Sequence, residues 1–153
     1  MNRAFSYVPV AHRGTYPTLP DGLQRSDVER LLTRCGDVFG LNAATIRILL
    51  VMLQHTRPAD WTSPNTAPVC FAAQTVIAEA SCRTTRAIRA AESKLSQAGI
   101  ILRRVGAGGA RGRWGSFTLG LDFSPLIERM DELTRANEER IEQTKRRTIL
   151  RKQ

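Results

Sequence analysis

The sequence predicts a mainly α fold with a small β-hairpin and a long helix at the C-terminus. Apolar residues recur at spacings of three and four over most of the chain, which is the period of a buried helix face. Two short apolar runs instead flank a glycine-rich stretch, which is typical of a hairpin. With 153 residues, 42% of them hydrophobic, the chain has the size of one globular domain. We expect an extended arm over residues 1–22, a folded domain over 23–123 and a charged helix over 124–153.

The N-terminal third is predicted to contain the arm and two helices. Prolines and glycines without a sustained period indicate that residues 1–22 are extended. Ser26 and Glu29 form a capping-box pattern at the start of the first helix. Asn42 is the predicted cap of a second helix, which runs through AATIRILLVMLQHT. Since this second helix has little polar surface, we expect it at the centre of the core.

A helix, a turn and a longer helix follow from Ala72. The first helix of the pair is short (AAQTVIAEA), and Ser81 and Cys82 form the predicted turn. The second helix runs through RTTRAIRAAESKLSQAG and stops at Gly99. Short strands are predicted at VCF before this unit, and at residues 100–102 and SFTLGLDF after it. The glycine-rich stretch joins the last two strands.

The last helix is predicted to begin with Ser124 as its cap and Pro125 as its first residue. Its apolar stripe is narrow and is interrupted at Asn137. This interruption favours packing across the core helices over a stable coiled coil. A homodimer through this helix is the alternative.

The positive charge of the chain is concentrated in one segment. There are 23 Lys and Arg residues against 14 Asp and Glu, which gives a formal net charge of +9 and a pI near 10.7. Eight basic residues and one acidic residue, Glu92, lie between Cys82 and Gly115, so seven of the nine net charges fall there. A charge that served solubility alone would be spread over the surface. The concentration therefore predicts a polyanionic partner, in particular double-stranded DNA.

The longer helix after the turn has the features of a DNA-recognition helix. Its apolar stripe (Ile88, Ala91 and Leu95) is expected to face the core, so basic and hydroxyl side chains face outwards near its N-terminus. Arginine can pair with guanine in the major groove, and threonine can contact a thymine methyl group or a phosphate. The alternative is an ordinary amphipathic helix with a solvated basic face, which the charge concentration disfavours. The predicted DNA contacts on this helix are Arg83, Thr84, Thr85, Arg86, Arg89 and Ser93.

The glycine-rich sequence GAGGARGRWG does not fit a nucleotide-binding loop. A P-loop ends in Gly-Lys-Ser/Thr, and both it and the dinucleotide-binding loop open a helix. This stretch lacks the Lys-Ser/Thr pair and joins two strands. We therefore interpret it as the tip of a hairpin beside the recognition helix, the wing of a winged helix-turn-helix fold, on the DNA backbone or minor groove. The predicted wing contacts are Arg103, Arg104, Arg111 and Arg113.

The sequence offers no catalytic, cofactor or metal site. No spacing pairs a nucleophile with a base, and His12 and His55 are far apart and accompany no paired cysteines. Three cysteines without a secretory pattern predict reduced thiols in the cytoplasm. No apolar run approaches the roughly 18–20 residues of a membrane span. We expect a cytoplasmic protein that is not an enzyme and holds no cofactor.

Several sequence blocks resemble a known family. SCRTTRAIRAAESKLSQAGIILRR, the glycine- and arginine-rich stretch and GLDFSPL (residues 120–126) are similar to the N-terminal domain of RepC, the replication initiator of alphaproteobacterial repABC plasmids. GLDFSPL is the most specific block, because generic winged-helix regulators do not share it. The resemblance covers about residue 23 to the end. It implies a winged-helix domain that binds plasmid origin DNA, with Thr85, Arg86 and Arg89 on the recognition helix.

Three features depart from that family. RepC proteins are longer and have a second domain, Cys82 stands where glycine is usual, and Glu92 replaces an apolar residue of the recognition helix. The leading hypothesis is sequence-specific binding of duplex DNA in plasmid replication initiation. The first alternative is a stand-alone transcriptional regulator of a plasmid or mobile element. An alternative of another class is a protein-interaction adaptor that acts through the C-terminal helix.

Overall fold

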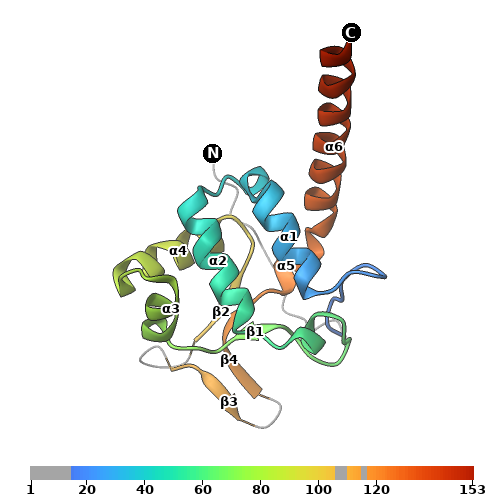
Figure 1. The fold of residues 1–153 in the computed structure, drawn as a ribbon. Helices are drawn as coiled ribbons and strands as arrows, with labels where there is room; N and C mark the ends of the chain where they lie inside the picture. Colours follow the sequence, from blue (N-terminus) through green and yellow to red (C-terminus); the bar gives the residue numbers. More distant parts are fainter. Residues whose placement is uncertain (1–14, 106–109, 115–116) are drawn as a thin grey trace.

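In a computed structural model, residues 15–105, 110–114 and 117–153 form six α-helices, two 3₁₀ helices and four short strands (Figure 1). The helices are α1 (Arg25–Cys35), η2 (Gly36–Phe39), α2 (Ala43–Gln54), η3 (Pro58–Trp61), α3 (Gln74–Ser81), α4 (Thr85–Gln97), α5 (Ser124–Glu128) and α6 (Met130–Lys152). The strands are β1 (Val69–Cys70), β2 (Leu102–Arg104), β3 (Gly112–Trp114) and β4 (Phe117–Asp122). This confirms the predicted class, a mainly helical fold with a small antiparallel sheet and a long C-terminal helix. Most of the predicted arm lies outside the described residues.

Strand β4 organises the sheet. It pairs antiparallel with β1 and β2 near its C-terminal end, where Asp122 lies opposite both Val69 and Leu102, and with β3 near its start. A Cβ atom at Gly120 would overlap the carbonyl oxygen of Cys70 and would lie 2.9 Å from the Cα of the next residue of the chain. The absence of a side chain at Gly120 therefore lets β1 approach β4.

Replacing Gly120 by Ala is expected to lower the free energy of unfolding by about 1–3 kcal/mol, because the backbone of β1 must move to admit the methyl group. Urea unfolding followed by circular dichroism measures this loss. Gly36→Ala is the matched control, since the added methyl group there meets the end of the flexible Ile46 side chain. It should cost less, and equal losses for the two variants would contradict the close-approach account.

The sequence block GLDFSPL forms the turn that attaches α5 to the core. The carboxylate of Asp122 accepts the N–H of Ser124 at 2.8 Å and pairs with Arg104 at 2.9 Å. The buried Phe123 ring stacks on Trp61 with a centroid distance of 5.8 Å. Ser124 is the first residue of α5, so the prediction that it caps the helix is wrong. Asp122, two residues earlier, accepts the first N–H of the helix instead.

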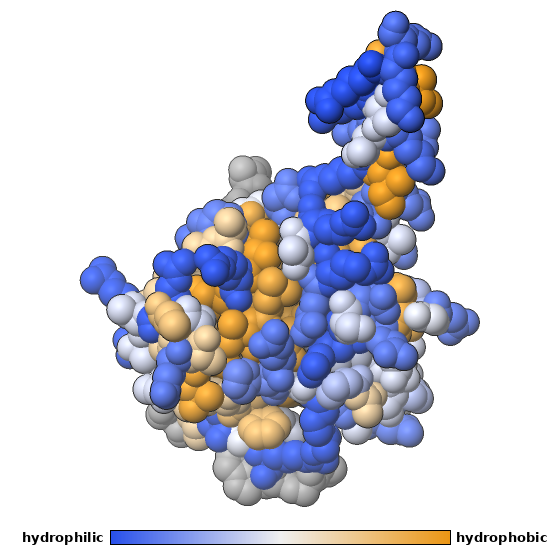
Figure 2. Space-filling model, in the orientation of Figure 1, coloured by the Kyte–Doolittle hydropathy of each residue, from blue (hydrophilic) through white to orange (hydrophobic). Residues whose placement is uncertain are grey.

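Helix α2 lies at the centre of the core, as predicted. The side chain of its cap, Asn42, accepts the N–H of Thr45 at 2.9 Å. One side of α2 remains partly open, and Figure 2 shows an apolar strip over this helix, where Ile46, Leu50 and Val51 are partly buried. The fully packed side of α2 contributes Ile48, Leu49, Met52 and Leu53 to the core.

Helix α1 begins one residue before the predicted cap. The N–H of Gln24 donates to Oδ2 of Asp27 at 2.8 Å, so these two residues form the capping box. Ser26 is already helical, and Glu29 instead forms an ion pair with Arg25 at 3.7 Å. The predicted Ser26–Glu29 box is therefore wrong. The segment offers two polar pairs at the same spacing, and the earlier pair caps the helix.

The C-terminal helix is interrupted at Arg129, which has a φ of −106° and separates α5 from α6. The prediction of one continuous helix from Ser124 is wrong at this residue. The guanidinium of Arg129 packs on the Phe39 ring, 4.5 Å from its centroid, and donates to the carbonyl oxygen of Ala98. These contacts hold the junction against the body of the domain.

Helix α6 packs on the domain only through its first turns and then projects away from it (Figure 1). Met130 and Leu133 are buried, whereas every residue from 138 to 153 is exposed. Arg140 forms the outermost attachment, with an ion pair to Asp37 at 2.7 Å. The hydrogen bond from this guanidinium holds the pKa of the Asp37 carboxyl below its ordinary value.

Candidate nucleic-acid interface

A tight turn joins α3 to α4, as the sequence predicted. Cys82 has φ 55° and ψ 42°, which is the left-handed conformation. The N–H of Arg83 then donates to the carbonyl oxygen of Ala78 at 2.9 Å. Thr84 caps α4, since its hydroxyl oxygen accepts the N–H of Ala87 at 3.1 Å. These bonds fix the two helices relative to each other.

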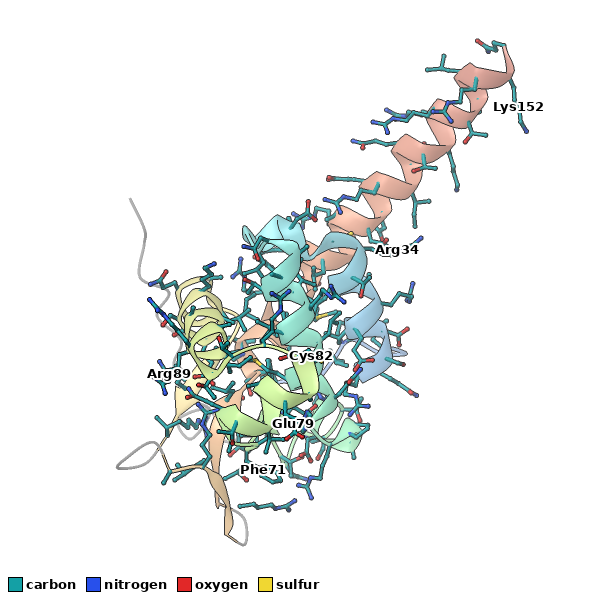
Figure 3. All side chains as sticks on the ribbon, turned by 60° about the vertical axis from the view of Figure 1, so that its left-hand side comes forward. Arg34, Phe71, Glu79, Cys82, Arg89 and Lys152 are labelled. Carbon is teal, nitrogen blue, oxygen red and sulfur yellow. The ribbon has the colours of Figure 1, made fainter. Side chains whose placement is uncertain are left out.

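The two faces of α4 differ in the way that the sequence predicted. Ile88, Ala91 and Leu95 are buried in the core. Thr85 is half-buried at the start of the helix, and Figure 3 shows Arg89 on the outer side of α4. The other residues predicted to contact DNA, which are exposed, are Arg83, Thr84, Arg86 and Ser93.

Glu92 belongs to the inward face of α4 and is fully buried. Nη2 of Arg111 donates to both of its carboxylate oxygens, at 2.8 and 3.0 Å, and the guanidinium of Arg103 lies 3.5 Å away. The side-chain amide of Gln74 donates to the same carboxylate at 3.0 Å. Glu92 follows Ile88 by four residues and so falls on the apolar stripe of the helix. An acidic residue on a buried stripe indicates that basic partners are buried with it.

The arginines predicted for the wing lie in different environments. Arg103 and Arg104 are neighbours on β2, so their side chains point to opposite faces of the sheet, towards Glu92 and Asp122 respectively. The Arg111 side chain is only 7% exposed. Its predicted role as a surface cation is therefore corrected: from the position just before β3 it forms a buried ion pair with Glu92 of α4.

The fourth predicted wing residue, Arg113, is exposed on β3. Together with Arg104 it lines a polar cavity of about 210 Å³, which also includes Arg57 and Asp60. Arg57 and Asp60 are paired with each other at 3.1 Å. Of the predicted wing tip, residues 106–115, Gly112–Trp114 form strand β3, whereas residues 106–109 and 115 lie outside the described residues.

Strands β2, β3 and β4 together form the predicted hairpin, with β2 and β3 each paired to β4. A notch of about 460 Å³ lies between the start of α3, the exposed face of α4 and this hairpin. Arg89 and Arg103 line it, together with Thr75 and Thr85. Phe71 also lines it, and Figure 3 shows this ring below α3, towards the hairpin. Thr75 and Phe71 are not among the residues predicted from the sequence. Both residues lie at or just before the start of α3. This position could have indicated a DNA contact, because the first helix of a helix-turn-helix motif approaches the DNA backbone.

Other kinds of site find little support in the part of the chain that the structure describes. No group of three or more His, Cys, Asp or Glu side chains there could hold a metal ion. None of the described helices has the length and apolar character to cross a membrane. Cys35 and Cys70 are buried, and burial raises the pKa of the Cys70 thiol to about 11, whereas Cys82 is exposed.

A family model described as Replication protein C N-terminal domain matches residues 7–153 of the chain. The chain belongs to this family. The resemblance seen in the sequence is thereby confirmed, and membership in the replication protein C family implies a role in replication. No curated protein and no solved structure matches the chain.

Two departures from the usual replication protein C pattern can be located in the structure. Cys82 occupies the left-handed position of the turn, and Glu92 forms the buried centre of the contact between α4 and the hairpin. The first departure implies backbone strain, because a side chain in that conformation costs about 1–2 kcal/mol. The second introduces a buried charge with partners on three other segments, α3, β2 and the residue before β3.

Replacing Cys82 by Gly is expected to raise the free energy of unfolding by about 0.5–1 kcal/mol, because relief of the left-handed strain exceeds the added chain entropy of glycine. Urea unfolding measures the change. Cys82→Ser keeps the strained side chain but removes the thiol, so it should not stabilise the domain. Equal stabilisation by the two variants would show that the thiol, and not the backbone conformation, is responsible.

Proposed function

We propose that this domain binds double-stranded DNA in a sequence-specific manner during the initiation of plasmid replication, with α4 in the major groove. The observation that carries this proposal is the row of exposed basic and hydroxyl residues in the turn before α4 and in the first half of this helix, on the side that faces away from the core. The acidic residue of the same helix is buried and paired, so it does not oppose a phosphate backbone at the surface. Arg86 and Arg89 are the proposed base-reading residues.

The hairpin provides the proposed backbone or minor-groove contact. Arg103 retains 40% exposure of its side chain beside the notch, and Arg113 is exposed on β3. Arg111 is not a proposed phosphate contact, because its guanidinium is committed to Glu92. The Arg104 guanidinium pairs with Asp122 and faces the other side of the sheet, which makes it a secondary contact in this proposal.

The notch between α4 and the hairpin accommodates one DNA strand in this arrangement. A strand that leaves the major groove beside a recognition helix passes the first helix of the motif and the adjacent wing. The notch offers the guanidinium of Arg103 and the hydroxyls of Thr75 and Thr85, which can donate to phosphate oxygens. The proposed DNA-binding unit is residues 23–123. Helix α5 and the first turns of α6 also contribute residues to its hydrophobic core.

The proposal is tested by titrating a labelled fragment of the replicon's own origin with the protein. A scrambled duplex of the same length and composition is the control. Specific binding requires an affinity at least a thousandfold higher for the origin than for the scrambled duplex at the same salt concentration. Equal affinities would contradict sequence-specific binding. Preference for a promoter operator over the origin would favour the alternative, a transcriptional regulator with the same interface.

The exposed half of α6 favours a second candidate role as a protein-binding element. Ile141, Ile149 and Leu150 retain 40, 59 and 69% exposure, and Figure 3 shows Lys152 at the far tip of the helix. A homodimer through this segment is one form of this role. Light scattering over a range of protein concentrations tests it, and a constant monomer mass would exclude the homodimer.

Neither of the two proposed roles involves catalysis or a cofactor, and the proposed location of the protein is the cytoplasm.

A further inference from the structure

We infer that Glu92 is a positioning residue for DNA binding, whose buried carboxylate holds the hairpin and the start of α3 at a fixed place relative to the recognition helix. This inference rests on the proposed function, because it concerns how the same interface is shaped. Glu92 itself is fully buried and cannot touch DNA. It acts through Arg111, Arg103 and Gln74, which come from three other segments of the chain.

The first connection joins α4 to the hairpin. Nη2 of Arg111 donates to Oε1 and Oε2 of Glu92, at 2.8 and 3.0 Å, with both side chains almost entirely removed from solvent. The other terminal nitrogen of Arg111 donates to the carbonyl oxygen of Ala72 at 3.5 Å. One guanidinium, just before β3, therefore links the hairpin to α4 and to the segment that leads into α3. Because charge-assisted contacts of this kind have a narrow geometry, they restrict the angle between the hairpin and α4.

The second connection orients a proposed base-reading residue. Nε2 of Gln74 donates to Oε2 of Glu92 at 3.0 Å, and this bond determines which way the amide faces. The amide oxygen of Gln74 then accepts Nε–H of Arg89 at 3.3 Å. The orientation of Arg89, on the wall of the notch, thus depends on a carboxylate that lies one turn further along the same helix.

The third connection, between Glu92 and Arg103, leaves the Arg103 guanidinium available to contact DNA. Arg103 lies 3.5 Å from the Glu92 carboxylate but retains 40% exposure of its side chain. One carboxylate faces two guanidiniums, Arg103 and Arg111, so the group has an excess positive charge. Arg111 occupies both carboxylate oxygens in the interior, and Arg103 is directed to the notch, where it can meet a phosphate.

Glu92→Gln tests the inference, because the amide preserves the shape but cannot accept the two bonds from Arg111. We expect the ratio of specific to non-specific affinity to fall at least tenfold, since Arg89 loses its fixed orientation. The slope of log K against log[salt] should change by less than about one phosphate contact, because Arg103 already meets a phosphate in the proposed complex and Arg111 remains buried. Glu79→Gln is the matched control: it removes the same charge from an exposed position on α3 and should change the specificity ratio less than twofold. A folded Glu92→Gln protein with an unchanged ratio would overturn the inference.

A second variant and a measurement without DNA keep the inference testable if Glu92→Gln does not fold. Gln74→Met removes the connection to Arg89 and leaves the ion pair with Arg111, so it should lower the specificity ratio without changing the salt slope. In the free protein, NMR should detect a slowly exchanging Nε–H of Arg89 in the wild type and fast exchange in Gln74→Met. Equal exchange rates would overturn the inference even if DNA binding is normal. Failure of the wild type to bind any duplex would instead reject the proposed function and leave this measurement valid.

Discussion

Replacing Glu92 by Ala is expected to lower the free energy of unfolding by about 3–5 kcal/mol, because the variant leaves the buried Arg111 guanidinium without its partner. Arg103 is more exposed and can turn to solvent, but Arg111 is 7% exposed and cannot. A loss of this size is a large part of the total stability of a small domain. Urea unfolding monitored by circular dichroism gives the value directly.

Two controls separate the ion pair from general packing. The double variant Glu92→Met/Arg111→Met removes both charges and keeps much of the side-chain volume, so its stability should lie within about 2 kcal/mol of the wild type. Glu79→Ala, on an exposed face of α3, should change stability by less than about 0.5 kcal/mol. If Glu92→Ala costs no more than Glu79→Ala, the buried network does not stabilise the domain.

Replacing Arg86 by Ala is expected to weaken binding to the preferred DNA sequence by about 1–3 kcal/mol and to relax the preference at one base pair. The reason is the exposed place of Arg86 on the outward face of α4, where a guanidinium can pair with a guanine edge. Anisotropy titrations with the preferred duplex and with its single-base variants measure both effects. A selection from random duplexes identifies the preferred sequence first.

The matched control for Arg86 is Arg34→Ala, which removes the same charge from an exposed position of α1. Figure 3 shows Arg34 beside α6, on the opposite side of the domain from α4. This control should leave the affinity within about twofold, since a distant surface charge is screened at physiological salt. Specificity that survives Arg86→Ala intact would show that this residue does not read a base.

The elements that follow from local patterns were predictable from the sequence. The apolar stripe of α4, the cap at Asn42 and the stop at Gly99 each depend on residues within one or two turns, and the structure has all three. The cap of α1 was misplaced because two polar pairs at equal spacing compete within one segment. Local chemistry alone does not decide between them, since such local preferences are weak and tertiary context overrides them.

The environments of the wing arginines could not be predicted from spacing. Arg111 is paired with a residue 19 positions away, and Arg104 with one on a different strand. Such contacts depend on how α4 packs on the sheet, which no local pattern contains. Alternation on β2 could have separated Arg103 from Arg104, because neighbouring strand residues face opposite sides of a sheet. The left-handed Cys82 was visible in the sequence only as a departure from the usual glycine.

The most direct test of the central claim is the dependence of duplex binding on salt concentration. If about five arginines of the α3–α4 unit, its connecting turn and the hairpin meet phosphates, log K should fall against log[salt] with a slope of about −4 to −5. Affinity should then drop by roughly 250- to 1,000-fold between 50 and 200 mM salt. Replacing Arg83, Arg103 and Arg113 together by Ala should flatten the slope by up to about 3. A wild-type slope near zero, or no binding to any duplex at 50 mM salt, would contradict the account.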